Sequence, residues 1–129
     1  MNGSYLLDTN IVIALFADEV EVKESLATAN EVFISSITVG ELSYGAKKFT
    51  RSTENLERIK NFIANITVLG CDVETAYLYG KIKNKLRLKG RPLPENDIWI
   101  AAITLQHNLT LVTRDAHFQE VENLQTVTW

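Results

Sequence analysis

Leu6-Leu7-Asp8-Thr9-Asn10 is a short apolar run that stops at a carboxylate, and a helical pattern begins directly after it. Residues 5–7 have the composition of a buried strand, whereas residues 11–15 place apolar side chains at helical spacing. Asp8 is therefore expected at the carboxyl end of the first strand, the edge of an open parallel sheet where ligands bind. The alternative is that Asp8, Thr9 or Asn10 only caps the following helix.

The rest of the chain alternates between strand and helix patterns. Further strands are expected at residues 32–35, 66–69, 109–113 and 125–128. Helices are expected at residues 10–16, 20–29, 52–63, 73–88 and 95–106, and from an N-cap at Ser36 to about residue 50. This alternation predicts an α/β fold, a three-layer α/β/α domain with a mainly parallel sheet of four to five strands. No linker or repeat divides the chain, so one domain over residues 1–129 is expected.

Several helix details follow from the same patterns. The helix after Ser36 is expected to bury an apolar stripe made of Val39, Leu42, Ala46 and Phe49. The helix at residues 73–88, capped by Asp72, is expected to turn inward Val73, Ala76, Tyr77, Gly80 and Leu86. Pro94 suits the first position of the helix that follows.

Composition and charge narrow the possible functions. At 129 residues and 46% hydrophobic, the chain can bury a real core. One cysteine, Cys71, and an N-terminus without a cationic region favour a reducing cytoplasm. The longest stretch without a formal charge, residues 98–113, is shorter than the roughly 20 apolar residues that span a bilayer, so no membrane association is expected.

The net charge of −3 argues at first sight against a nucleic-acid partner, but the charge is unevenly distributed. Between Glu74 and Glu95 there is no acidic residue, while the cationic residues there are Lys81, Lys83, Lys85, Arg87, Lys89 and Arg91. We call residues 81–91 the basic segment and treat it as a candidate phosphate contact. The alternative is a solvated helix face beside a loop.

Three further carboxylates are expected at the same sheet edge as Asp8. Glu41 lies near the start of its helix and off the apolar stripe, and helical side chains lean back toward the N-terminus. Asp97 begins a helix that is apolar on nearly every face. Because a helix packed antiparallel to the next strand begins near that strand's carboxyl end, Asp97 should lie close to Asp115. Taken singly, Glu41 could be an exposed helix residue, Asp97 could be a first-turn acid favoured by the helix dipole, and Asp115 could be a turn residue or a cap.

Four carboxylates in one cleft repel each other. Each pair at about 4 Å would cost on the order of 4 kcal/mol at an effective dielectric of 20. A hard divalent cation relieves that repulsion, so Mg²⁺ is expected, with Mn²⁺ as its substitute. Zinc is not expected, because Cys71 and the two histidines form no ligand pattern.

A Mg²⁺ ion held by carboxylates with open water positions suits phosphodiester hydrolysis. Polar residues that flank the acids could orient a carboxylate or a metal-bound water, and these are Thr9, Asn10, Asn96 and Thr113. His117, near Asp115, could contact RNA or transfer a proton, or it could be a simple surface histidine.

Four stretches of the chain resemble the motifs of PIN-domain ribonucleases, with the closest likeness to the VapC toxins of bacterial toxin–antitoxin pairs. They are LLDTN (6–10), SITVGELSYGA (36–46), PENDIWIAA (94–102) and LVTRD (111–115). Any one of these motifs is weak, but four in the proper order and spacing are specific. The resemblance covers essentially the whole chain.

The resemblance implies a Mg²⁺-dependent endoribonuclease whose acidic quartet is Asp8, Glu41, Asp97 and Asp115. Thr113 matches the hydroxyl position of the family. The resemblance further implies a homodimer, and a small VapB-like antitoxin whose C-terminal segment lies over the active site. It also implies a structured RNA target, often a transfer RNA. On this reading the residues that contact the RNA backbone are Lys47, Lys48, Lys83, Arg87 and Arg91.

Two other functions compete with this one. A phosphotransferase of the haloacid dehalogenase type also opens with a strand that ends in Asp, but its chemistry needs a second Asp two positions later, where this chain has Asn10. A non-catalytic RNA-binding or interaction domain is the other candidate. Such a domain has no reason to gather four acids where phosphate must approach.

Overall fold

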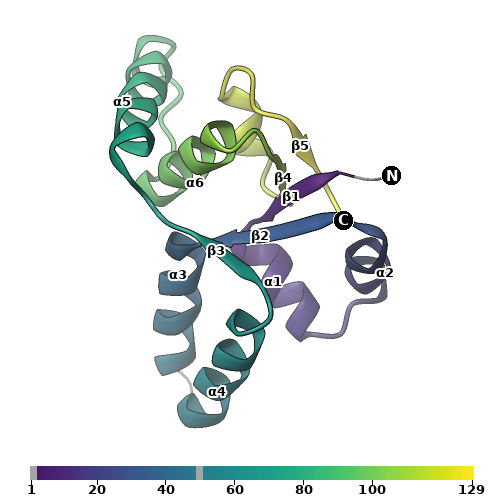
Figure 1. Ribbon diagram of the computed structural model, residues 1–129. Coiled ribbons are helices and arrows are strands. Elements are labelled where there is room, and N and C mark those ends of the chain that lie inside the picture. The colour runs from purple at the N-terminus through teal and green to yellow at the C-terminus, as the bar shows by residue number, and fades with distance from the viewer. Residues whose placement is uncertain (1–2, 49–50) are drawn as a thin grey trace.

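Strands and helices alternate along residues 3–48 and 51–129, which the computed structural model describes (Figure 1). The strands are β1 (Ser4–Leu7), β2 (Glu31–Ser35), β3 (Thr67–Leu69), β4 (Thr110–Val112) and β5 (Thr126–Val127). The helices are α1 (Thr9–Phe16), α2 (Val20–Thr28), α3 (Ser36–Lys47), α4 (Ser52–Ile63), α5 (Val73–Leu88), α6 (Glu95–Gln106) and the 3₁₀ helix η1 (Ala116–Glu120).

The strands form one sheet in the order β3-β2-β1-β4-β5, and all neighbouring strands are parallel. Strand β1 is central, with Tyr5 opposite Val32 of β2 and Leu6 opposite Leu111 of β4. Because the strands run the same way, their carboxyl ends share one edge of the sheet. The predicted α/β fold with a parallel sheet is confirmed.

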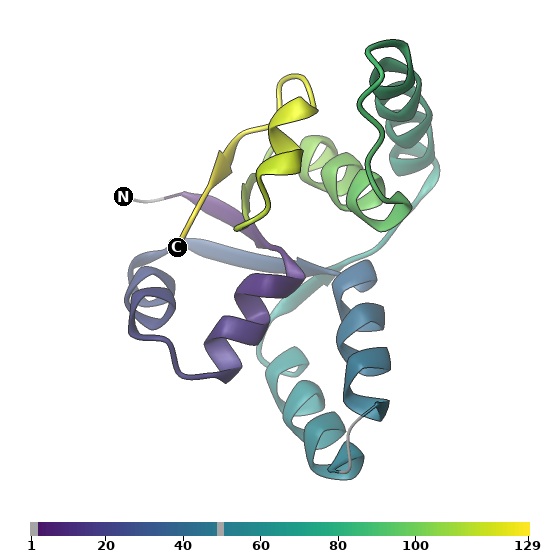
Figure 2. The same ribbon diagram turned by 180° about the vertical axis from the view of Figure 1, so that it is seen from behind.

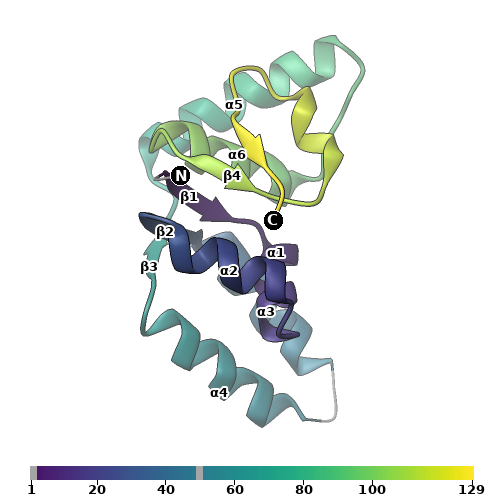
Figure 3. The same ribbon diagram turned by 90° about the vertical axis from the view of Figure 1, so that its right-hand side faces the viewer.

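Helices cover both faces of the sheet, which gives three layers (Figure 3). Side chains alternate along β1, so that Leu6 packs among residues of α5 and α6, whereas Tyr5 and Leu7 pack among residues of α1 to α4. Leu6 and Leu7 are completely buried. Burying such a side chain stabilises the fold by roughly 1.5–3 kcal/mol, so the strand that carries Asp8 is held firmly from both sides.

The N-cap of α3 is Ser35, and the prediction of Ser36 is wrong by one residue. The Ser35 hydroxyl accepts the backbone N–H of Thr38 at 3.1 Å, while the backbone of Ser35 is still extended. Leu42 and Ala46 of the predicted stripe are buried. Phe49 and the expected helix end near residue 50 lie outside the described residues. Pro94 likewise sits one position earlier than predicted, as the N-cap of α6.

The predicted inward face of α5 is largely wrong. Val73 and Tyr77 are 66% and 70% exposed, and Ala76 and Gly80 are exposed as well. Of the predicted residues Leu86 is buried, which confirms that part of the prediction, and the helix also buries Thr75 and Ile82. The reason is the packing of α5 against α6, where Tyr79 stacks on Trp99 with ring centroids 4.0 Å apart and Thr75 bonds to Gln106.

Helix η1, which follows β4, was not predicted. It carries Phe118, which is completely buried in the layer formed with α5 and α6. Within the described part of the chain, every helix is too short or too polar to cross a membrane.

Candidate active site

Asp8 lies where β1 ends and α1 begins, and its side chain is only 6% exposed. Its backbone N–H donates to the carbonyl oxygen of Val112 at 2.9 Å, which continues the β1–β4 pairing. Its Oδ1 accepts the N–H of Thr9 at 2.8 Å, so Asp8 is the N-cap of α1. Capping uses only part of this carboxylate, because Oδ2 is engaged elsewhere.

Thr113 joins the ends of β1 and β4. Its hydroxyl donates to Oδ2 of Asp8 at 2.7 Å and accepts the backbone N–H of Asp115 at 3.0 Å. Thr113 is 4% exposed, so these bonds are largely shielded from water. A single buried hydroxyl therefore sets both the orientation of Asp8 and the backbone position of Asp115.

Glu41 reaches the same place from α3. The Thr9 hydroxyl donates to Oε1 of Glu41 at 2.6 Å and lies 3.1 Å from the hydroxyl of Thr38. Asn96, beside Asp97 in α6, makes a long hydrogen bond of 3.4 Å from Nδ2 to Oε2 of Glu41. Thr9 and Asn96 thus connect α3 to the starts of α1 and α6, and Figure 2 shows α1 and α3 beginning side by side at the ends of β1 and β2.

Asp97 has the most perturbed titration in the cluster. Its pKa is raised from an ordinary 3.8 to about 6, mainly by burial and then by the charges of Asp8, Asp115 and Glu41, in that order of importance. The pKa of Asp8 is also raised, first by burial and to a lesser degree by Glu41 and Asp115, against the hydrogen bonds from Thr113 and Thr9. The four acids predicted from the sequence are therefore close enough to repel one another.

His117 contacts Asp115. Its Nδ1 lies 2.8 Å from Oδ1 of Asp115, and its backbone N–H donates to the same oxygen at 2.9 Å. The imidazole is 75% exposed. No lysine or arginine forms an ion pair with any of the four acids within the described residues.

The four acids do not form a closed metal cage. In residues 3–48 and 51–129, no three His, Cys, Asp or Glu side chains are arranged to hold one ion together. The donors that the quartet offers are carboxylate oxygens, the ligand type that Mg²⁺ takes through one or two carboxylates while it keeps several waters. Asn10, the fourth predicted flanking residue, has a buried side-chain oxygen without a hydrogen-bond partner in the described residues.

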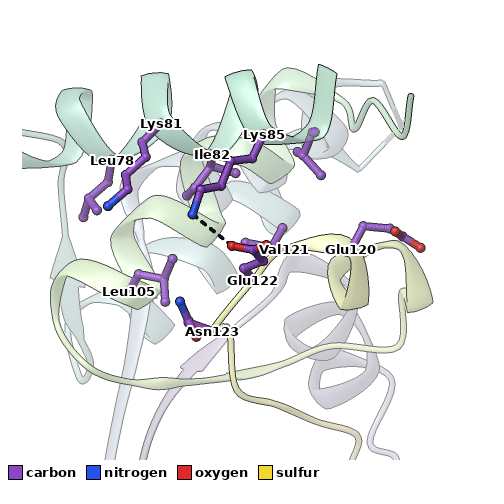
Figure 4. A pocket seen from close by; sticks show the side chains of 10 residues that line it. Leu78, Lys81, Ile82, Lys85, Leu105, Glu120, Val121, Glu122 and Asn123 are labelled. Carbon is purple, nitrogen blue, oxygen red and sulfur yellow. Dashed lines mark hydrogen bonds and ion pairs between the residues drawn. The ribbon is translucent and has the colours of Figure 1, made fainter. Parts of the chain in front are cut away.

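Three lysines of the basic segment form ion pairs with glutamates. Lys83 pairs with Glu95 and also bonds to the hydroxyl of Tyr79. Lys85 pairs with Glu122 across a pocket of about 190 Å³ between α5 and the C-terminal segment (Figure 4). Lys89 pairs with Glu120. None of the acidic quartet lines that pocket. The predicted RNA contacts at Lys83, Arg87 and Arg91 stay predictions.

Sequence reasoning missed Thr38, which is completely buried and lies next to the Thr9–Glu41 bond. The available signal was Ser35 followed three residues later by a threonine, a spacing typical of a helix start. The same reasoning did not identify the hollow of about 340 Å³ beside Glu41, which includes Gly40, Tyr44 and Asn96.

Known proteins resemble this chain over nearly all of its length. A family model described as PIN domain matches residues 5–124. The ribonuclease VapC2 of Haemophilus influenzae is 37% identical over 128 residues, which is 97% of each chain. A tRNA(fMet)-specific endonuclease VapC of Shigella flexneri is 34% identical over 128 residues, again 97% of each chain.

Solved structures agree with the sequence relatives. A DNA-bound VapBC from Salmonella typhimurium superposes with a TM-score of 0.90 at 31% identity, covering 98% of both chains. The VapBC2 of Rickettsia felis bound to a promoter DNA fragment gives a TM-score of 0.89 at 27% identity, covering 100% of this chain and 99% of the other. The chain therefore belongs to the PIN-domain family and, within it, to the VapC group.

Proposed function

We propose that this chain is a metal-dependent endoribonuclease, the toxin of a VapBC-type toxin–antitoxin pair. The observation that carries the proposal is the convergence of Asp8, Glu41, Asp97 and Asp115 on one sheet edge. There the neighbouring carboxylates add to burial in raising the pKa of Asp8 and of Asp97, and no lysine or arginine of the described chain pairs with any of the four acids. Relatives named as ribonucleases, at up to 37% identity, support the same conclusion.

The cation that fits these residues is Mg²⁺, with Mn²⁺ as substitute, held by carboxylates of the quartet. Their mutual repulsion is what a divalent cation relieves. Bound there, Mg²⁺ would lower the pKa of an attacking water and stabilise charge on the scissile phosphate. The orphaned oxygen of Asn10 supports a hydrated site, because a buried acceptor is normally satisfied by a donor such as ordered water.

The protein's own groups prepare the site before substrate arrives. Thr113 holds Asp8 through Oδ2, which fixes the direction of the remaining lone pairs of that carboxylate. Thr9 holds Glu41 in the same way. Because these donors are uncharged, they orient the acids without cancelling the negative charge that attracts a cation. The hydrolysed bond would be a phosphodiester of RNA.

The RNA is proposed to be structured, with transfer RNA as the first candidate, because one relative is named a tRNA(fMet)-specific endonuclease. The homodimer implied by the sequence resemblance is retained as part of this proposal. Light scattering on the purified protein tests it.

A VapB-like antitoxin is the proposed protein partner, since the solved neighbours are VapBC pairs. An apolar groove of about 350 Å³ between α1, α3 and α4 is a suitable place for it. Ile13, which is 55% exposed, lines this groove, and Glu41 lines it too. A segment bound in the groove would therefore reach the acidic quartet and could block it.

The proposal is tested with Asp8→Asn. This variant keeps the side-chain shape and should fold, but it should lose RNA cleavage in Mg²⁺ and growth arrest in cells. Asp18→Asn is the matched control, because Asp18 is 72% exposed and pairs with Lys23 at the surface. Wild-type cleavage by Asp8→Asn at equal metal and protein would remove Asp8 from the mechanism. Tight RNA binding in EDTA without cleavage in Mg²⁺ would instead favour a non-catalytic domain.

A further inference from the structure

Tyr44 is a large aromatic side chain that the fold leaves exposed beside the acidic quartet. It lies on α3 and is 66% exposed. The ammonium of Lys48 lies over its ring, 4.4 Å from the centroid. Core packing does not explain this residue, since the buried face of α3 is formed by Thr38, Leu42 and Ala46.

The helix geometry leaves open space on the other side of Tyr44. Residues four apart lie on the same helix face, so Tyr44 is flanked by Lys48 one turn toward the C-terminus and by Gly40 one turn toward the N-terminus. A Cβ atom at Gly40 would have no other atom within 4 Å. The hollow of about 340 Å³ is lined by Gly40, Tyr44 and Glu41, but not by Lys48.

The hollow is continuous with the acidic quartet. Glu41 lines it and is hydrogen-bonded to Thr9, the neighbour of Asp8. Asn96, which also lines it, is bonded to Glu41 and precedes Asp97. A nucleotide whose phosphate lies at the quartet would therefore place an adjoining base in or next to this hollow.

We propose that Tyr44 is a stacking platform for a nucleobase of the RNA, adjacent to the cleaved bond. This inference rests on the proposed endoribonuclease function. An exposed aromatic ring stacks on any base, because every base has a π-face. Lys47 and Lys48, exposed and without a carboxylate partner in the described chain, supply positive charge for the neighbouring phosphates.

The charge around Tyr44 favours RNA over a protein partner. The apolar groove proposed for the antitoxin uses a different side of α3, formed by Leu42, Gly45 and Ala46. Tyr44 does not line that groove, and the cations beside it suit a phosphate backbone.

The test uses an RNA that the wild-type protein cleaves, shortened to the smallest fragment around the mapped cleavage site that it still cleaves. Tyr44→Ala should raise KM by about 10-fold or more, the scale of losing one base–aromatic stack. Tyr44→Phe keeps the ring and should stay within about twofold of wild type, whereas Tyr44→Leu should behave like Tyr44→Ala. Tyr77→Ala removes an equally exposed tyrosine from α5 and is the control.

A direct readout separates stacking from a general effect on the fold. The base analogue 2-aminopurine, placed on either side of the cleavage site, should lose fluorescence on binding to the wild type and to Tyr44→Phe, but not to Tyr44→Ala. Circular dichroism checks that each variant folds.

The outcomes distinguish the two proposals. A wild-type protein that cleaves no RNA overturns the proposed function. An active Tyr44→Ala variant with unchanged KM and unchanged 2-aminopurine quenching overturns the stacking inference alone. The same unchanged values, together with weakened antitoxin binding, would assign Tyr44 to the protein partner.

Discussion

The acidic quartet and the basic segment are opposite in sign, and they also differ in how their charges are compensated. In the quartet, Asp8 and Glu41 are held by the neutral hydroxyls of Thr113 and Thr9. In the basic segment, lysines are held by carboxylates, as in the pair of Lys85 and Glu122. The first arrangement keeps its net charge, whereas the second cancels the charge of three of its six cations, Lys83, Lys85 and Lys89.

We interpret the uncompensated charge of the quartet as charge that serves function, and the paired charge of the basic segment as charge that serves structure. Carboxylates gathered without cations repel one another, and this repulsion adds to burial, the larger cause, in raising the pKa of Asp97. Lysines that pair with Glu95, Glu120 and Glu122 fasten α5 to α6 and to the C-terminal segment. Exposed ion pairs of this kind contribute little to stability, because solvent screens them. Four experiments test the comparison.

The largest effect is expected at Asp97. Asp97→Asn removes one of the four charges of the acidic quartet and should lower RNA cleavage by about 100-fold or more. Glu95→Gln, in the same helical turn, removes an acid that is paired with Lys83 and should stay within about twofold of wild type. Initial rates on one RNA at saturating Mg²⁺ measure both. Equal losses in the two variants would abolish the distinction between compensated and uncompensated acids.

The next effect concerns the hydroxyl that joins Asp8 to Asp115. Thr113→Val removes it at nearly constant shape and should raise the Mg²⁺ concentration for half-maximal cleavage by about 10- to 100-fold. Thr113→Ser keeps the hydroxyl and should recover most of the metal affinity. A metal titration of cleavage provides the measurement. If Thr113→Val and Thr113→Ser have the same metal dependence, the hydroxyl does not orient the site.

Much of this site follows from local sequence. The apolar run that stops at Asp8 predicts a strand end, and parallel strands share one edge, so the side of the fold where the acids gather could be predicted. The links between the acids could not. The bond from Thr9 to Glu41 joins residues on different helices, and its existence depends on how α1 packs against α3.

The fold was predictable to the extent that one apolar pattern dominated each segment. Helix α5 carries two interleaved stripes, and the one beginning at Val73 is exposed whereas the one through Thr75, Ile82 and Leu86 is buried. Local periodicity cannot choose between them, because the choice is made by α6. The carboxylate partners of Lys85 and Lys89 are also far away in sequence, so these ion pairs could not be predicted from local sequence patterns.

A smaller effect is expected in the pH dependence of stability without metal. The pKa of Asp97 is raised in the folded protein to about 6 from 3.8. The folded state therefore binds this proton more tightly than the unfolded state. The resulting stabilisation is complete below about pH 4 and is lost as the pH rises through 6.

Urea unfolding in EDTA at pH 5 and pH 7.5 tests this sign. Between these values the wild type should lose roughly 1 kcal/mol more stability than Asp97→Asn. This is less than the about 3 kcal/mol of the full shift because about half of that stabilisation is already lost at pH 5 and because Asp97 is partly exposed to solvent. Added Mg²⁺ should remove the difference at pH 7.5. A larger loss in Asp97→Asn than in the wild type would contradict the raised pKa.

The smallest effect separates cations that are free to meet phosphate from those already paired. Lys47 and Lys48 have no carboxylate partner in the described chain, whereas Lys83 has Glu95. Lys47→Gln and Lys48→Gln should each reduce the slope of log affinity against log salt by about 1, while Lys83→Gln should change it by much less. The Asp8→Asn background keeps the RNA intact during the binding measurement. A full unit of slope lost at Lys83 would show that RNA displaces Glu95 from its ion pair. Helix α5 would then belong to the RNA-binding surface. Ion pairing in the free protein would in that case no longer separate structural charge from functional charge.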